Sequence, residues 1–194
     1  MRLTGAMTRF GATLAALAAM LASTACSGGG RLRVESRDAI IEPALATAVY
    51  KSSDPNTADI FLSDFEPEVL EERLALGAEG PPGNLVHIHL FIDPRAGRTP
   101  IDFTATSATV RHVVFSGAAI GVYGGGGFLL PRGGIGGPSL TGRIENASLK
   151  LVSADPGFAD RLGLAELSGR VAATRDEEFS ARISTALTRL LSRR

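Results

Sequence analysis

The stretch GVYGGGGFLLPRGGIGG, residues 121–137, limits the possible folds most strongly, because more than half of it is glycine. A phosphate-binding loop needs a strand, a glycine turn and then a helix whose N-terminus faces the anion. Here an apolar, strand-like run and Pro131 follow the four successive glycines, and the third position of a G-x-G-x-x-G motif falls on Leu129. The pattern therefore argues against a nucleotide cradle.

Glycine within strands instead permits a bulge, a sharp bend or the close approach of another backbone or ring. We therefore expect a bent pair of strands here, with residues 133–137 forming a separate, looser turn. If they are exposed, the four successive glycines are a possible contact surface: Gly124, Gly125, Gly126 and Gly127.

Strand signals dominate the rest of the chain, with β-branched and aromatic residues in short runs between turn residues. The expected strands are 44–51, 57–63, 84–93, 104–115, 118–130, 140–152 and 166–174, the first two forming a hairpin, and residues 31–42 are either an edge strand or tether. The expected helices are 66–76, 155–162 and 176–193. The fold class is α+β, mainly antiparallel β as a sandwich or curved sheet, with a C-terminal amphipathic helix packed on the sheet.

The last helix carries apolar residues at helical spacing, at Phe179, Ile183, Leu187 and Leu190. Thr174, followed three residues later by Glu177, has the pattern of a capping box.

The first 25 residues have the three parts of a secretory signal, namely a basic start, an apolar run of about a dozen residues and a small-residue cleavage region. The residues Leu21-Ala22-Ser23-Thr24-Ala25-Cys26 resemble the lipobox of bacterial lipoproteins, although Ser23 stands where that family prefers Leu. The resemblance implies cleavage before Cys26 and lipidation of its thiol. The alternative is an ordinary signal peptide with an unmodified cysteine nearby.

Cys26 is the only cysteine, so it has no partner for an internal disulfide. A lipid anchor would tether the protein to a membrane without a transmembrane helix. Ser27 after the cysteine resembles family members sent to the outer membrane of diderm bacteria. We therefore expect a signal peptide at 1–25, a lipidated cysteine and flexible tether at 26–43, and one globular domain at 44–194.

Charge composition bears on the partners of the mature chain. Cleavage removes Arg2 and Arg9, which leaves 18 basic residues beside 20 acidic ones. This near balance argues against a nucleic-acid partner, which requires a basic face. It also argues against strong overall adhesion to anionic lipid.

All three histidines lie in expected strands. His87 and His89 are two residues apart and therefore point to one side of a strand, and His112 lies in a later strand. Three imidazoles that converge can bind Zn²⁺ and leave a position open for water. The alternative is that these histidines are hydrogen-bonded structural residues in apolar surroundings.

No nucleophile motif or distinctive acid–base pair is evident. The sequence therefore favours a lipid-anchored cell-envelope protein, on the periplasmic face of the outer membrane in a diderm bacterium. Its domain would bind or assemble with an envelope partner, without catalysis and without a cofactor. The competing hypothesis is a zinc-binding protein or zinc-dependent enzyme that uses His87, His89 and His112.

Overall fold

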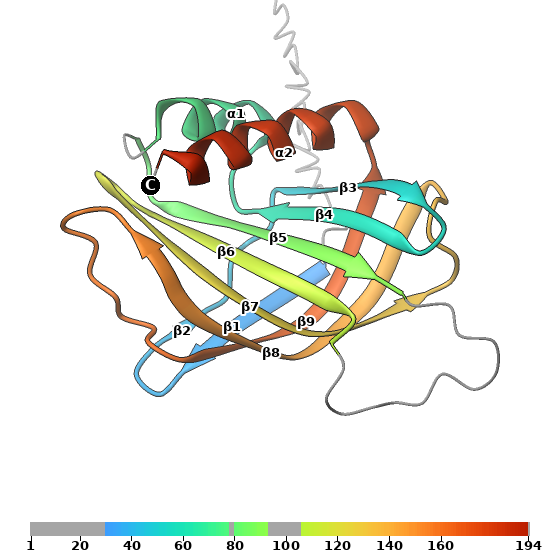
Figure 1. Ribbon diagram of the computed structural model, residues 1–194, viewed down its shortest axis with the longest axis horizontal. Helices are drawn as coiled ribbons and strands as arrows, with labels where there is room; N and C mark the ends of the chain where they lie inside the picture. The colour runs from blue at the N-terminus through green and yellow to red at the C-terminus, as the bar shows by residue number, and fades with distance from the viewer. Residues whose placement is uncertain (1–29, 78–79, 93–105, 194) are drawn as a thin grey trace, which may run out of the picture.

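The computed structural model describes residues 30–77, 80–92 and 106–193, and these form one strongly curved sheet with two helices (Figure 1). The strands are β1 (Gly30–Ser36), β2 (Ile40–Ile41), β3 (Thr47–Asp54), β4 (Thr57–Ser63), β5 (Gly83–Phe91), β6 (Ala108–Ser116), β7 (Ala119–Arg132), β8 (Ser139–Ala154) and β9 (Ala165–Arg175). The helices are α1 (Pro67–Leu76) and α2 (Glu177–Ser192). The predicted class, α+β with mainly antiparallel strands, is confirmed, and of the two predicted alternatives, a sandwich or a curved sheet, the structure has the curved sheet.

The sheet closes on itself through β9. Strands β3 to β9 follow one another antiparallel, and β9 also meets β3 in parallel at two residue pairs, Val49 with Thr174 and Tyr50 with Arg175. The earlier part of β9 pairs instead with β1, which carries the short edge strand β2. Of the two alternatives for residues 31–42, an edge strand or more tether, the structure shows strands, because β1 and β2 lie in this segment and pair with β9 and with each other.

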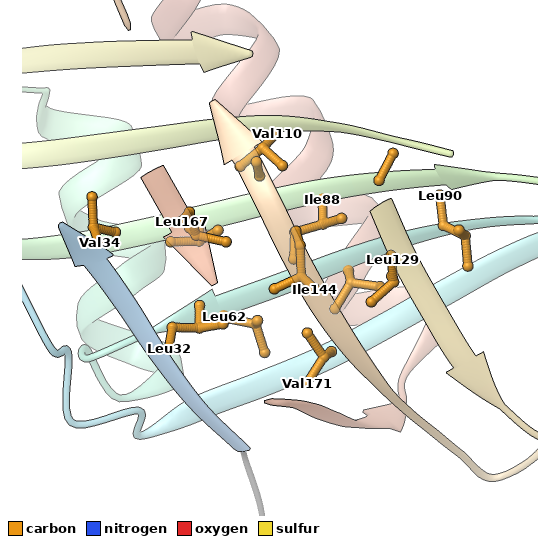
Figure 2. Close-up of a cluster of buried hydrophobic side chains, with 14 of the residues drawn as sticks. Leu32, Val34, Leu62, Ile88, Leu90, Val110, Leu129, Ile144, Leu167 and Val171 are labelled. Atoms are coloured by element: carbon orange, nitrogen blue, oxygen red, sulfur yellow. The ribbon is translucent and has the colours of Figure 1, made fainter. Parts of the chain in front are cut away.

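The inner face of the closed sheet holds the larger hydrophobic core. Alternate residues of each strand point inward, as Ile88 and Leu90 do in β5 and Leu129 does in β7 (Figure 2). These side chains meet inward-facing residues of the distant strand β1, such as Leu32, which is fully buried. Burial on this face fixes the register of every strand, because a one-residue slip would turn the apolar set outward.

The two helices cover one side of the closed sheet from outside, where they form a second core (Figure 1). Phe179, Ile183, Leu187 and Leu190 of α2 are all buried against it, as expected from their spacing. The expected capping box is wrong. Thr174 still belongs to β9, and Asp176 caps α2 instead by accepting a hydrogen bond from the Phe179 amide at 2.9 Å.

Arg73 departs from the usual pattern of a surface helix. It shares the buried face of α1 with Leu70 and Leu74 and is only 1% exposed. Its guanidinium carbon lies 4.9 Å from the centroid of the Phe115 ring, and its three nitrogens have no hydrogen-bond partner among the described residues. Burial lowers the pKa of Arg73, an effect that the neighbouring Glu72 partly opposes. A cation–π contact therefore offsets part of the cost of burying this charge.

The helix expected at 155–162 is absent, and the segment is an irregular loop. Asp160 organises it, because its Oδ1 atom accepts hydrogen bonds from the Leu162 amide at 3.1 Å, the Gly163 amide at 2.8 Å and the Tyr123 hydroxyl at 2.6 Å. Aspartate side chains that bond nearby amides favour turns over helix, which explains the failed prediction.

In the described part of the chain, neither helix is long and apolar enough to cross a membrane.

Candidate binding surface on the outer face of the sheet

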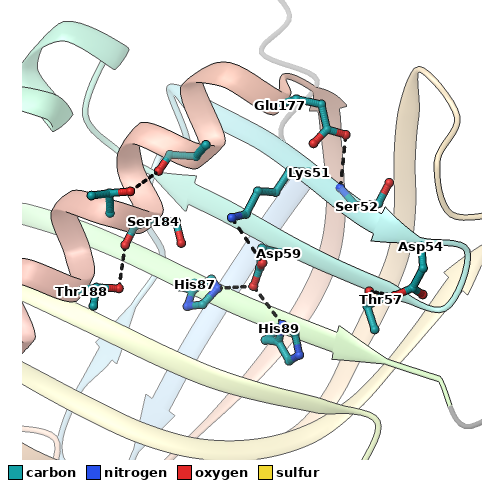
Figure 3. Close-up of polar contacts among 12 residues, drawn as sticks. Lys51, Ser52, Asp54, Thr57, Asp59, His87, His89, Glu177, Ser184 and Thr188 are labelled. Carbon is teal, nitrogen blue, oxygen red and sulfur yellow. Dashed lines mark hydrogen bonds and ion pairs between the residues drawn. The ribbon is translucent and has the colours of Figure 1, made fainter.

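A histidine pair and one carboxylate form a compact cluster on the outer face. His87 Nε2 and His89 Nδ1 each lie 2.9 Å from Oδ1 of Asp59, which is in the neighbouring strand β4 (Figure 3). The register explains the convergence, because Asp59 is directly opposite His89. A carboxylate can only accept, so each of the two facing nitrogens carries the proton.

The environment keeps Asp59 ionised. Burial alone would raise the pKa of this carboxyl, but the hydrogen bonds from His87 and His89 together with their charge hold it well below its usual range. Lys51 adds a weaker contact, with its Nζ 3.8 Å from Oδ2 of Asp59. The ionised carboxylate of Asp59 therefore holds both imidazoles in place by accepting a hydrogen bond from each.

The two histidines differ in how accessible they are. His87 stacks on Phe61, with ring centroids 4.7 Å apart and planes 7° from parallel, and its side chain is 10% exposed. The His89 side chain is 42% exposed. His87 is therefore a structural residue, and His89 is the member that a partner can reach.

His112 does not join this cluster, so the geometry does not support the competing hypothesis of three converging histidines. Directly opposite residues of antiparallel strands share a face, and His112 is opposite Val86 whereas His87 is opposite Arg111. His112 therefore points into the closed sheet, away from His87 and His89. Across the described residues, no group of three or more histidine, cysteine, aspartate or glutamate side chains is arranged to hold a metal ion.

Inside the sheet, His112 is held in one tautomer by a chain of hydrogen bonds. Asn84 donates from its side-chain amide to Asp64 Oδ2 at 2.7 Å, which leaves its Oδ1 to face His112 Nε2 at 2.9 Å. His112 must therefore donate from Nε2. Its Nδ1 is buried without a hydrogen-bond partner in the described structure, and burial lowers the pKa of His112 to about 4.

This burial leads to an expected dependence of stability on pH. Because the folded pKa of about 4 lies below the ordinary value of 6.5, the unfolded chain binds the proton more readily, and stability falls as pH drops from 6.5 to 4. The loss should be roughly 3 kcal/mol, since each pKa unit corresponds to about 1.4 kcal/mol. Urea unfolding of wild type and His112→Gln across this pH range measures it. An equally steep decline in the variant would show that His112 is not the cause.

The four successive glycines lie in β7, and two of them approach the backbone of β8. A Cβ on Gly125 would lie 1.7 Å from the Ser148 carbonyl oxygen, and one on Gly127 would lie 2.6 Å from Cα of Ala147. The β7–β8 register shifts at two places, one of them between Gly126 and Phe128. The expected close approach and bulge are thus both present. Gly125 is exposed, Gly124 and Gly126 are half-buried and Gly127 is buried.

The first glycine of the stretch has a different role. A Cβ on Gly121 would lie 2.1 Å from the ring of Phe158, so this glycine gives room to an aromatic side chain of the loop before β9. The later turn at 133–137 also makes a contact, because the Gly137 carbonyl accepts a hydrogen bond from the buried Tyr50 hydroxyl.

Strand pairing joins the histidine cluster and the glycines into one surface. His87 is directly opposite Arg111 of β6, and Arg111 is directly opposite Gly124 of β7. Two residues further along β5, His89 lies opposite Thr109, which in turn lies opposite Gly126. We call this set the β4–β7 surface; its residues are Asp59, His87, His89, Thr109, Arg111, Gly124 and Gly126.

Two members of this surface, Asp59 and Arg111, could not be selected from sequence, because each is one of many scattered charges. The alternation of β5 predicted the shared face of His87 and His89 but not the strand opposite them. Cys26, the predicted lipidation site, lies outside the described residues.

Comparison with known proteins adds no relative: no family model matches the chain, and no curated protein or solved structure is significantly similar to it.

Proposed function

We propose that this chain is an exported lipoprotein, anchored to the cell envelope through a lipid on Cys26, whose domain binds an envelope partner without catalysis. In a diderm bacterium the anchored protein would reside on the periplasmic face of the outer membrane. The observation that carries the proposal is the lipobox-like run Leu21-Ala22-Ser23-Thr24-Ala25-Cys26, which follows a signal-like segment and ends at the only cysteine of the sequence. The sheet and both cores, as far as the structure describes them, consist of residues that follow Cys26 in the sequence.

The β4–β7 surface is the proposed contact site for the partner. Arg111 is exposed beside Gly124 and Gly126, which are half-buried. A Cβ on Gly124 would lie 3.2 Å from the side chain of exposed Val152 of β8, and one on Gly126 would lie 3.4 Å from the side chain of Thr106. A strip with no side chains of its own lets a flat group or an extended backbone approach closely. Arg111 and the half-exposed His89 supply polar groups at its border.

The hydrogen bonds of the histidines favour binding over nucleophilic catalysis. A general base that activates a nucleophile must contact a hydroxyl or thiol. Within the described ranges, neither His87 nor His89 has such a bond, and both donate to Asp59. The role of the cluster in this proposal is to hold the exposed side chain of His89 in one position on the β4–β7 surface.

Replacing the anchor residue tests the proposal. We expect Cys26→Ser to move the protein from the membrane fraction to the soluble fraction, because a thiol is required for lipid attachment. Fractionation followed by immunoblotting measures the shift, and Ser27→Ala is the matched control that keeps the cysteine and should stay with the membrane. A Cys26→Ser protein that remains membrane-bound would contradict the proposal.

A further inference from the structure

Three arginines lie side by side across the outer face of β1, β9 and β8. Arg31 is directly opposite Arg170, and Arg170 is directly opposite Arg143. All three are exposed. Like charges at directly opposite positions of a sheet repel each other, so this arrangement opposes folding unless something else compensates it.

Among the described residues, carboxylates neutralise only the two ends of this arginine row. Arg31 pairs with Glu42 at 3.1 Å, and Arg143 pairs with Glu145 at 2.7 Å. Arg170, in the middle, has no ion-pair partner in the part of the chain that the structure describes. The row therefore presents uncompensated positive charge to an external anion.

The position of the row indicates what that anion is. Arg31 follows Gly30, and only three residues separate Gly30 from Cys26. Four residue steps of fully extended chain reach at most about 14 Å. A lipid on Cys26 would therefore hold the row within a short distance of the membrane headgroups.

The surroundings of the row suit a membrane surface. Leu130 of β7 is directly opposite Arg143 and is 55% exposed, so it adds an apolar side chain at the end of the row. The acidic residues Glu35 and Glu166 face each other at the far end of the same β1–β9 pairing. Glu42 and Glu145 pair with the two ends of the row, whereas Glu35 and Glu166 lie away from the start of β1.

We propose that the row of Arg31, Arg143 and Arg170, with Leu130, docks the domain onto anionic phospholipid headgroups. This inference rests on the proposed lipid anchor, because the anchor brings the row to the membrane. Each arginine near an anionic surface should strengthen partition about fivefold. Docking would fix the orientation of the domain, so that the β4–β7 surface, on other strands, is presented consistently to a partner.

Vesicle binding tests the docking without the anchor. The mature Cys26→Ser chain is mixed with vesicles of phosphatidylcholine alone or with one third phosphatidylglycerol, and the bound fraction is measured by sedimentation. We expect preference for the anionic vesicles that weakens with rising salt. Arg170→Gln should reduce binding about fivefold, and the triple Gln variant of the row about a hundredfold.

Arg189→Gln is the matched control, because it removes an exposed arginine from α2 and should leave vesicle binding unchanged. Equal binding to both kinds of vesicle, or an equal loss in the control, would overturn the docking. Such a result leaves the anchor untouched, since fractionation of Cys26→Ser tests that separately. All the substituted arginines are exposed, so circular dichroism should show unchanged folding.

Discussion

Gly125→Ala should destabilise the domain by at least about 3 kcal/mol, the upper part of the range for overpacked positions. The added methyl would lie 1.7 Å from the Ser148 carbonyl oxygen, and that oxygen belongs to the backbone of β8. The clash with this backbone oxygen can be removed only if β7 and β8 move apart, because no side-chain rotation moves a backbone atom away. Chemical denaturation of wild type and variant measures the change.

Gly134→Ala is the control for this substitution. Gly134 lies in the later turn and is exposed, and a methyl added there would have no atom within 4 Å. Its expected effect is within about 0.5 kcal/mol of wild type. If Gly125→Ala were as stable as Gly134→Ala, the close pairing of β7 and β8 at the glycines would be wrong.

Deleting the chain from Phe179 onward should unfold the domain. The deletion removes four buried side chains, Phe179, Ile183, Leu187 and Leu190. At roughly 1.5–3 kcal/mol each, their burial is worth about 6–12 kcal/mol, as much as the whole stability of a typical domain. The outer core would also be exposed to water.

Circular dichroism and thermal melting of the truncated chain provide the measurement. A milder variant, Ile183→Ala, should cost about 2–5 kcal/mol because Ile183 is fully buried. The control Arg189→Ala changes an exposed residue of the same helix and should have little effect. A truncated chain with an unchanged melting temperature would show that α2 is a detached arm.

Local patterns predicted most of the elements correctly. The hairpin of β3 and β4, the strand containing His87 and His89, and the terminal helix all follow from residue spacing, because burial on one face imposes a period of two or 3.6. The predicted tight approach at the glycines also appears, at Gly125 and Gly127.

Properties that depend on pairing between distant strands could not be predicted. The spacing of His112 from the other histidines suggested a shared metal, but the face on which each lies depends on the register of β5 and β6. Arg73 lies among charged residues of α1, so the local sequence gives no sign that its side chain is buried. The burial of Arg73 depends on its contact with the Phe115 ring. Phe115 is distant in sequence, so no local pattern predicts that contact.

The arginine row illustrates the same limit for charge. A nearly neutral composition argued against adhesion to anionic lipid, yet the pairing of β1, β9 and β8 places three arginines in line. The net charge of a chain does not predict the local charge of one surface, because folding brings together charged residues that are distant in sequence. The short link from Cys26 to Gly30 connects this local charge to the proposed anchor.

Mass spectrometry of the N-terminal peptide from the membrane-extracted protein tests the lipid anchor most directly. We expect the mature chain to begin at Cys26, with the added mass of a lipid on that residue. A chain that begins elsewhere and carries an unmodified Cys26 would contradict the proposed anchor and the docking that depends on it.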